Sequence, residues 1–128
     1  MALFNLKQTD VITRLRGNAA EDAALAHLLA AGLTLVERNY RTPGRGGGEI
    51  DLVMREAGGT LVFVEVRARA GTTHGGAAAS VGGVKQRRIV LAARHYLMRQ
   101  KSPPPCRFDV VAIDGNHIEW LKAAFDAA

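Results

Sequence analysis

The chain has 128 residues, of which 48% are hydrophobic, so it is long enough for one compact domain spanning residues 1–128. Seventeen Lys and Arg against twelve Asp and Glu give a formal net charge of +5, which favours anionic partners such as nucleic acid but also suits a surface that is merely solvated. A single cysteine excludes an internal disulfide, and no apolar run approaches the roughly 20 residues of a membrane span, so we expect a cytoplasmic protein without a membrane segment.

The first predicted element is a helix that begins at or before Asn18. Asn18 and Glu21 have the spacing of a capping box, and leucines then recur at helical spacing until Gly32 ends the segment. Residues 33–40 are loosely strand-like, and the glycine-rich sequence TPGRGGG interrupts them.

A hairpin is predicted next, with strands over Glu49–Arg55 and Leu61–Arg69 and a loop around EAGGT. Residues 70–83 are mostly Gly, Ala, Ser and Thr and predict a loop, and a second helix is expected from about Val84 to Lys101. CRFDVVAID then indicates a buried strand, and HIEWLKAAF a last strand or extended tail. The order of helix, three strands, helix and two strands predicts an α/β fold with a central mixed sheet flanked by helices.

The hairpin carries the candidate site. If it closes symmetrically about Gly58, Asp51 faces Glu65 across the strands. Strand alternation then places Glu49 on the same face as these two acids, and it places an apolar set on the other face: Ile50, Leu52, Met54, Val62, Val64 and Val66. Directly opposed carboxylates repel by on the order of 3 kcal/mol at an effective dielectric near 20, so the pair needs a compensating cation.

Two kinds of cation fit this requirement. Mg²⁺ or Mn²⁺ takes carboxylate oxygens together with water and phosphate oxygens. Alternatively, Arg67 and Arg69 neutralise the acids in a surface ion network. The spacing alone does not separate these two readings.

Each helix adds one charged residue on its apolar stripe. Glu21 precedes Leu25 by four residues, and Lys85 stands in the same relation to Ile89. Either can be explained alone, Glu21 by the capping box and Lys85 by extension to water from the first turn. Buried charges need partners, however, so the coincidence of Glu21 and Lys85 with the two hairpin acids favours one shared polar site.

Two groups of basic residues could contact a phosphate backbone. On the second helix, basic residues recur every seven positions, with two more on the flank: Arg87, Arg94 and Lys101, and Arg88 and Arg99. Arg41 precedes the glycine-rich segment and Arg45 lies within it, both beside the proposed site, and Arg69 at the end of the second hairpin strand is a further candidate contact. Such faces are often only solvated, and neither group predicts recognition of a specific base sequence.

The motifs GEIDL, FVEVRAR, VKQRR and RFDVV, in this order, closely resemble the YraN-like family of bacterial proteins. The resemblance extends over nearly the whole chain, including NAAEDAALAHLLAAG in the first helix and the RNYR segment. That family is similar to the restriction-endonuclease-like, PD-(D/E)XK superfamily, which includes Holliday-junction resolvases. The resemblance implies an αβββαβ core, a divalent metal ion such as Mg²⁺ or Mn²⁺, and a nucleic-acid substrate, with a homodimer as one assembly.

Carried over by position, the resemblance makes Asp51 and Glu65 metal-binding acids and Glu21 the helix-borne carboxylate of resolvase-like members. Arg67 stands where the motif has lysine, and an arginine with a pKa above about 12 cannot accept a proton. Arg67 is then expected to stabilise charge on the phosphate, with Lys85 assisting. The leading hypothesis is a metal-dependent endonuclease acting on DNA, in branched or single-stranded form; the alternatives are a non-catalytic DNA-binding or recombination-partner module of the same fold and, third, a structural protein whose acids form ion pairs.

Overall fold

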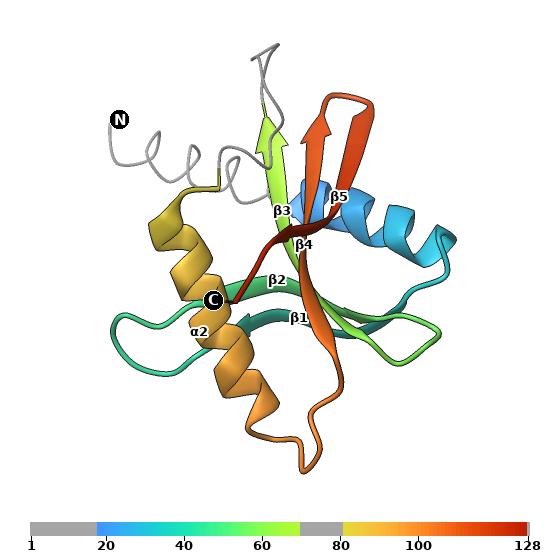
Figure 1. The fold of residues 1–128 in the computed structure, drawn as a ribbon. Coiled ribbons are helices and arrows are strands. Elements are labelled where there is room, and N and C mark those ends of the chain that lie inside the picture. The colour runs from blue at the N-terminus through green and yellow to red at the C-terminus, as the bar shows by residue number, and fades with distance from the viewer. Residues whose placement is uncertain (1–17, 70–80, 128) are drawn as a thin grey trace, which may run out of the picture.

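The computed structural model describes residues 18–69 and 81–127 (Figure 1). Its elements in chain order are a first helix (residues 18–30), β1 (Thr34–Arg41), β2 (Glu49–Arg55), β3 (Leu61–Arg69), α2 (Gly83–Leu97), β4 (Cys106–Asp114) and β5 (His117–Phe125). This is the predicted order, and the hairpin strands have the predicted bounds. The prediction of a loop over residues 70–83 concerns mainly residues 70–80, which lie outside the described part.

The five strands form one mixed sheet in the order β1-β2-β3-β4-β5. Only the β3–β4 pair is parallel, and α2 lies in the connection between these two strands, as a parallel crossover requires. The neighbouring pairs β1–β2, β2–β3 and β4–β5 are antiparallel. The α/β prediction, with an αβββαβ-type core and a central mixed sheet flanked by helices, is therefore confirmed, with β5 added at the edge.

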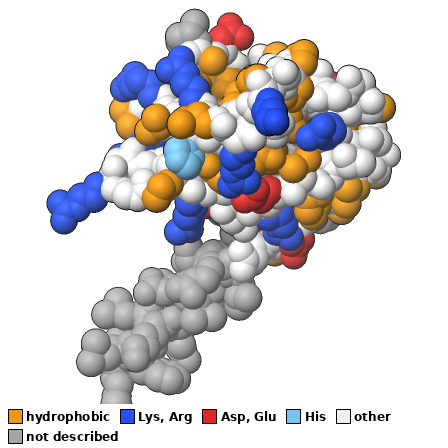
Figure 2. All heavy atoms as spheres, turned by 90° about the horizontal axis from the view of Figure 1, so that it is seen from below, with side chains coloured by type: hydrophobic (Ala, Val, Ile, Leu, Met, Phe, Trp, Pro, Cys, Tyr) orange, Lys and Arg blue, Asp and Glu red, His pale blue; other side chains and the backbone are white. Residues whose placement is uncertain are grey.

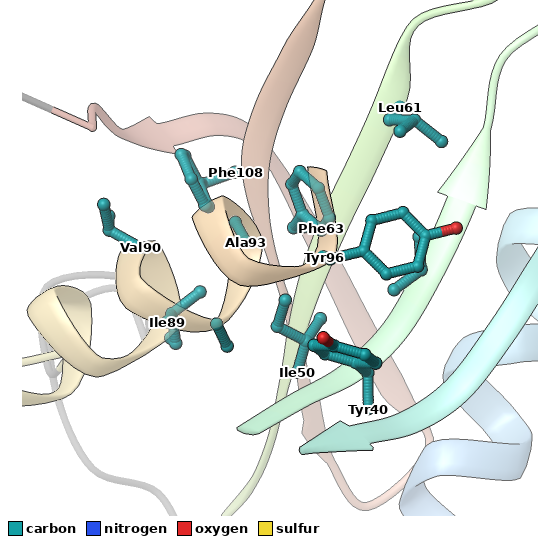
Figure 3. Close-up of a cluster of buried hydrophobic side chains, with 11 residues drawn as sticks. Tyr40, Ile50, Leu61, Phe63, Ile89, Val90, Ala93, Tyr96 and Phe108 are labelled. Atoms are coloured by element: carbon teal, nitrogen blue, oxygen red, sulfur yellow. The ribbon is translucent and has the colours of Figure 1, made fainter. Parts of the chain in front are cut away.

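The two helices cover opposite faces of the sheet, and each face has its own core (Figure 1). Beneath α2 the core is aromatic: Phe63 meets Tyr96 edge-on with ring centroids 5.9 Å apart, and it stacks on Phe108 at 5.6 Å (Figure 3). Beneath the first helix the core is aliphatic, with these buried members: Ala20, Ala24, Leu28, Leu33, Leu52, Met54, Val62, Val64, Val111 and Ile113.

Two helix boundaries differ from the predictions. Asn18 is already helical, so it is not the residue that caps the first helix. The second helix ends at Leu97, and the amide of Met98 completes its last turn by donating to the carbonyl of Arg94. Lys101 therefore lies beyond the helix, because the sequence that follows contains three consecutive prolines that cannot continue one.

Gly48 lets α2 lie directly on the start of β2. A Cβ atom at this position would fall 1.8 Å from the carbonyl oxygen of Arg88 and 3.2 Å from the Cβ of Ala92. The amide of Gly48 also donates a hydrogen bond of 2.8 Å to Thr42 Oγ1 in the preceding turn. The last glycine of TPGRGGG thus fixes the distance between helix and strand just before the acidic residues begin.

The prediction for Ile50 is wrong. It was expected on the same face as Leu52 and Met54, but it packs beneath α2 together with Val53 and Phe63, whereas Leu52 and Met54 pack beneath the first helix. The side chains of β2 therefore change faces between Ile50 and Leu52, and strict alternation fails at the residue between them.

Strand β1 makes the same change beside β2. Arg38 forms ion pairs with the first helix, whereas Tyr40, two residues later, is buried beneath α2. Asn39 between them has φ 54°, in the left-handed region that asparagine tolerates better than most residues. The register aligns these residues with the switch in β2, so both strands bend together and Asp51 lies at the bend.

A buried carboxylate joins β4 to β5. Asp109 is fully buried and accepts hydrogen bonds from Arg107 Nε at 3.0 Å, Trp120 Nε1 at 2.9 Å and the amide of Ala123 at 2.9 Å. Ala123 has φ 51° and lies where the β4–β5 register shifts. The carboxylate therefore stabilises a bulge in the last strand.

Candidate active site

Asp51 and Glu65 meet where the two hairpin strands separate. The paired stretch runs from Arg55 opposite Leu61 to Leu52 opposite Val64, which is the predicted register. One residue further, Asp51 Oδ2 accepts a hydrogen bond of 2.8 Å from the amide of Val66. The Asp51 side chain thus takes the place of a backbone partner at the point where β2 bends away from β3.

A cavity of about 280 Å³ opens at this point, between the starting ends of the two helices. Four carboxylates line it, two from β2, one from β3 and one from the first helix: Glu49, Asp51, Glu65 and Glu21. Lys85 is the basic residue in its lining, and Ala20, Val66 and Ala68 complete it. The structure therefore brings together Glu21, Asp51, Glu65 and Lys85, the four residues that sequence analysis assigned to one shared site.

Repulsion and burial raise the pKa of two of these acids. The pKa of Asp51 rises from 3.8 to about 7, first because burial disfavours its ionised form and next because the Glu65 carboxylate lies close by. Burial likewise raises the pKa of Glu21, and the charge of Asp51 adds to this effect. The cavity thus concentrates negative charge that the surrounding protein only partly offsets.

Lys85 supplies part of the offset. Its Nζ lies 3.2 Å from Glu65 Oε2, although half of the lysine side chain is exposed, so it both pairs with the acid and reaches solvent. Arg67 Nη1 lies 4.0 Å from the same oxygen, and its side chain is 33% exposed. Glu65 itself is buried, and of these two cationic side chains the one from α2, Lys85, is nearer to its carboxylate.

Arg38, which was not among the predicted site residues, holds Glu21 in place. Arg38 Nη2 lies 3.4 Å from Glu21 Oε1 and 2.9 Å from Asp22 Oδ1, so it joins β1 to the start of the first helix. Arg38 is the first residue of the RNYR segment, but the spacing of residues along a strand does not show which helix the side chain of an arginine contacts. At the mouth of the cavity, Arg41 Nε lies 3.4 Å from Glu49 Oε2.

Comparison with known proteins gives the family. The model of "Uncharacterised protein family UPF0102" matches residues 20–113. The chain belongs to this family. A UPF0102 protein of Albidiferax ferrireducens is 61% identical over 127 residues, covering 99% of both chains. UPF0102 proteins of Acidovorax sp. (strain JS42) and Methylibium petroleiphilum are 68% and 69% identical, covering 91% and 92% of this chain and 88% and 99% of theirs. This confirms the YraN-like resemblance.

In this UPF0102 chain, the other predicted nucleic-acid contacts do not line the acidic cavity. Arg45 is exposed in the connection between β1 and β2, and three arginines are exposed on α2: Arg87, Arg88 and Arg94. The prediction for Arg69 concerns a side chain that the structure does not describe. Within residues 18–69 and 81–127, no helix is long and apolar enough to cross a membrane.

The donor set of the cavity fits a hard divalent cation. Its carboxylate oxygens are the ligands that Mg²⁺ and Mn²⁺ prefer, and a bound ion would offset both causes of the raised pKa of Asp51, its burial first and the nearby Glu65 charge second. No group of three or more His, Cys, Asp or Glu side chains among the described residues is already arranged around one point for a metal ion. An ion here would therefore be held by two of the carboxylates and complete its shell with water or phosphate oxygens.

Proposed function

We propose that this protein is a metal-dependent nuclease that hydrolyses phosphodiester bonds in DNA, in branched or single-stranded form. The observation that carries the proposal is the convergence of Asp51 and Glu65 in one open cavity, with Lys85 at 3.2 Å from Glu65. An acid pair beside a lysine is suited to binding a cation and a phosphate together. The resemblance to PD-(D/E)XK nucleases supports the same chemistry.

Each acid has a distinct part in this proposal. Asp51 and Glu65 would hold Mg²⁺, because their carboxylates come from adjacent strands and meet where those strands part. Glu21, held by Arg38, lines the same cavity and would add a third negative charge beside the ion. When bound, the ion supplies positive charge to the phosphate and lowers the pKa of a coordinated water.

Lys85 takes over a duty that Arg67 cannot perform. Hydrolysis adds a water oxygen to phosphorus and expels the sugar oxygen. The attacking water, made more acidic when a cation is bound, gives up one proton to solvent, and the sugar oxygen must gain one. An ammonium group can give up a proton at moderate cost, whereas a guanidinium cannot. Lys85 Nζ, next to Glu65, would donate this proton, and Arg67 would stabilise negative charge on the phosphate oxygens.

The test is a cleavage assay on labelled linear, four-way branched and single-stranded DNA with Mg²⁺ or Mn²⁺. We expect cleavage that EDTA prevents and that Asp51→Asn lowers at least about a hundredfold, because the cation loses a charged ligand. Arg67→Lys, which restores the lysine of the motif, should keep or raise the rate. If neither the wild type nor Arg67→Lys cuts any of the three substrates, the nuclease proposal is wrong.

The second candidate function is a binding module that recognises DNA without cutting it. It is favoured by the Lys85–Glu65 ion pair itself, since a lysine that already neutralises Glu65 reduces the need for a metal ion. Calorimetric titration with Mn²⁺ separates the two candidates. Binding that Asp51→Asn abolishes supports the nuclease, whereas DNA binding with a steep salt dependence and no Mn²⁺ binding supports the module.

A further inference from the structure

The outer face of α2 carries an apolar ridge that the proposed nuclease activity does not use. Val84, Leu91 and Met98 are 58%, 48% and 80% exposed and recur every seven residues, about two helical turns. They lie opposite the buried side of the helix, which includes Ile89 and Ala93. Three large apolar side chains aligned on one solvent-facing helix are unusual in a protein without a partner there.

Basic residues border this ridge on both sides. By helical spacing, Arg87 and Arg94 follow one flank, and Arg88 and His95 follow the other; all four are exposed. Figure 2 shows Lys and Arg side chains set among hydrophobic ones on the face seen from below. A helix that displays an apolar line between two basic lines is complementary to a surface with an apolar line between two acidic ones.

A groove extends the basic flank. It has a volume of about 560 Å³ and lies between α2 and the residues that follow β5. Arg87, Leu91 and Arg94 line its helix side, and Arg94 Nη2 donates to the carbonyl of Ala127 at 3.3 Å on the other side. The lining also includes Asp126, so the apolar ridge has a concave border in which two arginines outnumber one acid, and this gives an acidic partner side chain somewhere to enter.

We propose that this face of α2 docks an acidic amphipathic helix of another protein. The partner would place apolar side chains at seven-residue spacing against Val84, Leu91 and Met98, and its Asp or Glu residues beside the flanking arginines. Charge decides against a second copy of this chain, because an antiparallel α2–α2 contact would set Arg87 against Arg94 of the other copy. The apolar centre of the face decides against DNA, because a phosphate backbone has no apolar surface that could cover the three exposed side chains.

Three exposed apolar side chains predict a small interface. An interface of this size belongs to transient complexes, so we expect the affinity of a single helix to be micromolar rather than nanomolar. The apolar ridge lies on α2, and the first turn of this helix carries Lys85, which lines the acidic cavity. Docking here would place a partner protein next to the proposed active site without covering it.

The test uses a labelled acidic peptide of three heptads, with leucine at the positions that match the ridge and glutamate on both flanks. Fluorescence anisotropy with the full chain should show saturable binding, and Leu91→Ser should weaken it about tenfold or more, because the variant loses most of one buried leucine contact. Leu29→Ser is the matched control: this leucine is 46% exposed but lies on the first helix, across the sheet. It should leave binding unchanged.

A charge exchange makes the test specific. Arg87→Glu with Arg94→Glu should abolish binding of the acidic peptide and create binding of the same peptide with lysine in place of glutamate. No binding by the wild type, or binding that Leu91→Ser does not weaken, overturns the proposal. So does Leu91-dependent binding to phosphatidylglycerol vesicles or to duplex DNA without peptide binding, or Leu91-dependent dimerisation in sedimentation. Because no step measures cleavage, failure here is distinct from failure of the nuclease proposal.

Discussion

Asp51 is the residue at which folding and the proposed function oppose one another. Its carboxyl group has a pKa of about 7 in the folded protein against 3.8 as its ordinary value, because burial and the nearby Glu65 disfavour its charge. The folded state therefore binds more protons than the unfolded state between these two pH values. Folding stability, without metal, should fall as the pH rises from about 4 to about 7, by on the order of a few kcal/mol, and then level off.

Urea unfolding of the metal-free protein at a series of pH values measures this slope. Asp51→Asn removes the titrating group, so the variant should lose much of the slope and be more stable than the wild type at pH 8. Added Mn²⁺ should raise the wild-type midpoint at pH 8 and leave that of Asp51→Asn unchanged, by mass action on the folded state. A wild-type midpoint that rises between pH 4 and pH 7 would contradict the assignment of the slope to this group.

Lys85 allows a second prediction at a single residue. Lys85→Met keeps the length of the side chain but removes the charge 3.2 Å from Glu65 Oε2. We expect Mn²⁺ affinity to be kept or increased, since a competing cation is lost, while the cleavage rate falls about a hundredfold. Lys101→Met, an exposed lysine beyond the end of α2, is the control and should leave both quantities unchanged. Equal loss of metal binding and cleavage in Lys85→Met would assign Lys85 a role in folding instead.

At the scale of the elements, the contact between α2 and β2 is the one that positions the cavity. Gly48→Ala would drive a Cβ atom into the carbonyl of Arg88, so the helix must move away from the strand. We expect a loss of roughly 3 kcal/mol of folding stability in urea unfolding, at the upper end for overpacking. Gly58→Ala, in the hairpin loop where the added Cβ meets nothing within 4 Å, should change stability little. Similar losses in both variants would contradict the assignment of the Gly48 effect to the contact with Arg88, since the chain-entropy effect of a Gly→Ala change is stabilising.

The junction of β4 and β5 depends on the carboxylate of Asp109. Asp109→Ala leaves Arg107 and the indole N–H of Trp120 without their shared acceptor, and breaking such a buried pair costs about 3–5 kcal/mol. Trp120 is the only tryptophan, so its fluorescence in urea reports the junction directly. Asp126→Ala, an exposed acid after β5, should not change the transition. A transition of Asp109→Ala that matches the wild type would show that the bulge stands without this carboxylate.

Sequence patterns succeeded for these elements where local rules decide the structure. Two alternating apolar runs about Gly58 fix a hairpin register, and that register brings Asp51 next to Glu65. They failed where two elements act together. Ile50 changes face because β1 and β2 bend jointly at Asn39, and no period within β2 contains that information. Arg38 was missed for the same reason, since its partners belong to a helix.

For the whole molecule, the decisive feature is that the cavity draws on both faces of the sheet. Glu21 comes from the helix on one face and Lys85 from the helix on the other, and the bend at Asp51 opens the sheet between them. Neither helix is close to Glu65 in sequence, so only the folded chain assembles the site. This arrangement also separates two surfaces, the cavity with its arginine-bearing β1–β2 connection and the outer face of α2.

That separation leads to a prediction about how the charge of +5 is used. If DNA approaches the cavity, Arg41, which is 73% exposed at its mouth, should contact a phosphate, whereas Arg94 on the outer face of α2 should not. Each phosphate contact contributes roughly one unit to the slope of log affinity against log salt concentration. Measured by anisotropy in EDTA, to prevent cleavage, Arg41→Ala should lower this slope by about one unit and Arg94→Ala should not change it. The reverse result would place DNA on α2 and leave the acidic cavity without its proposed substrate.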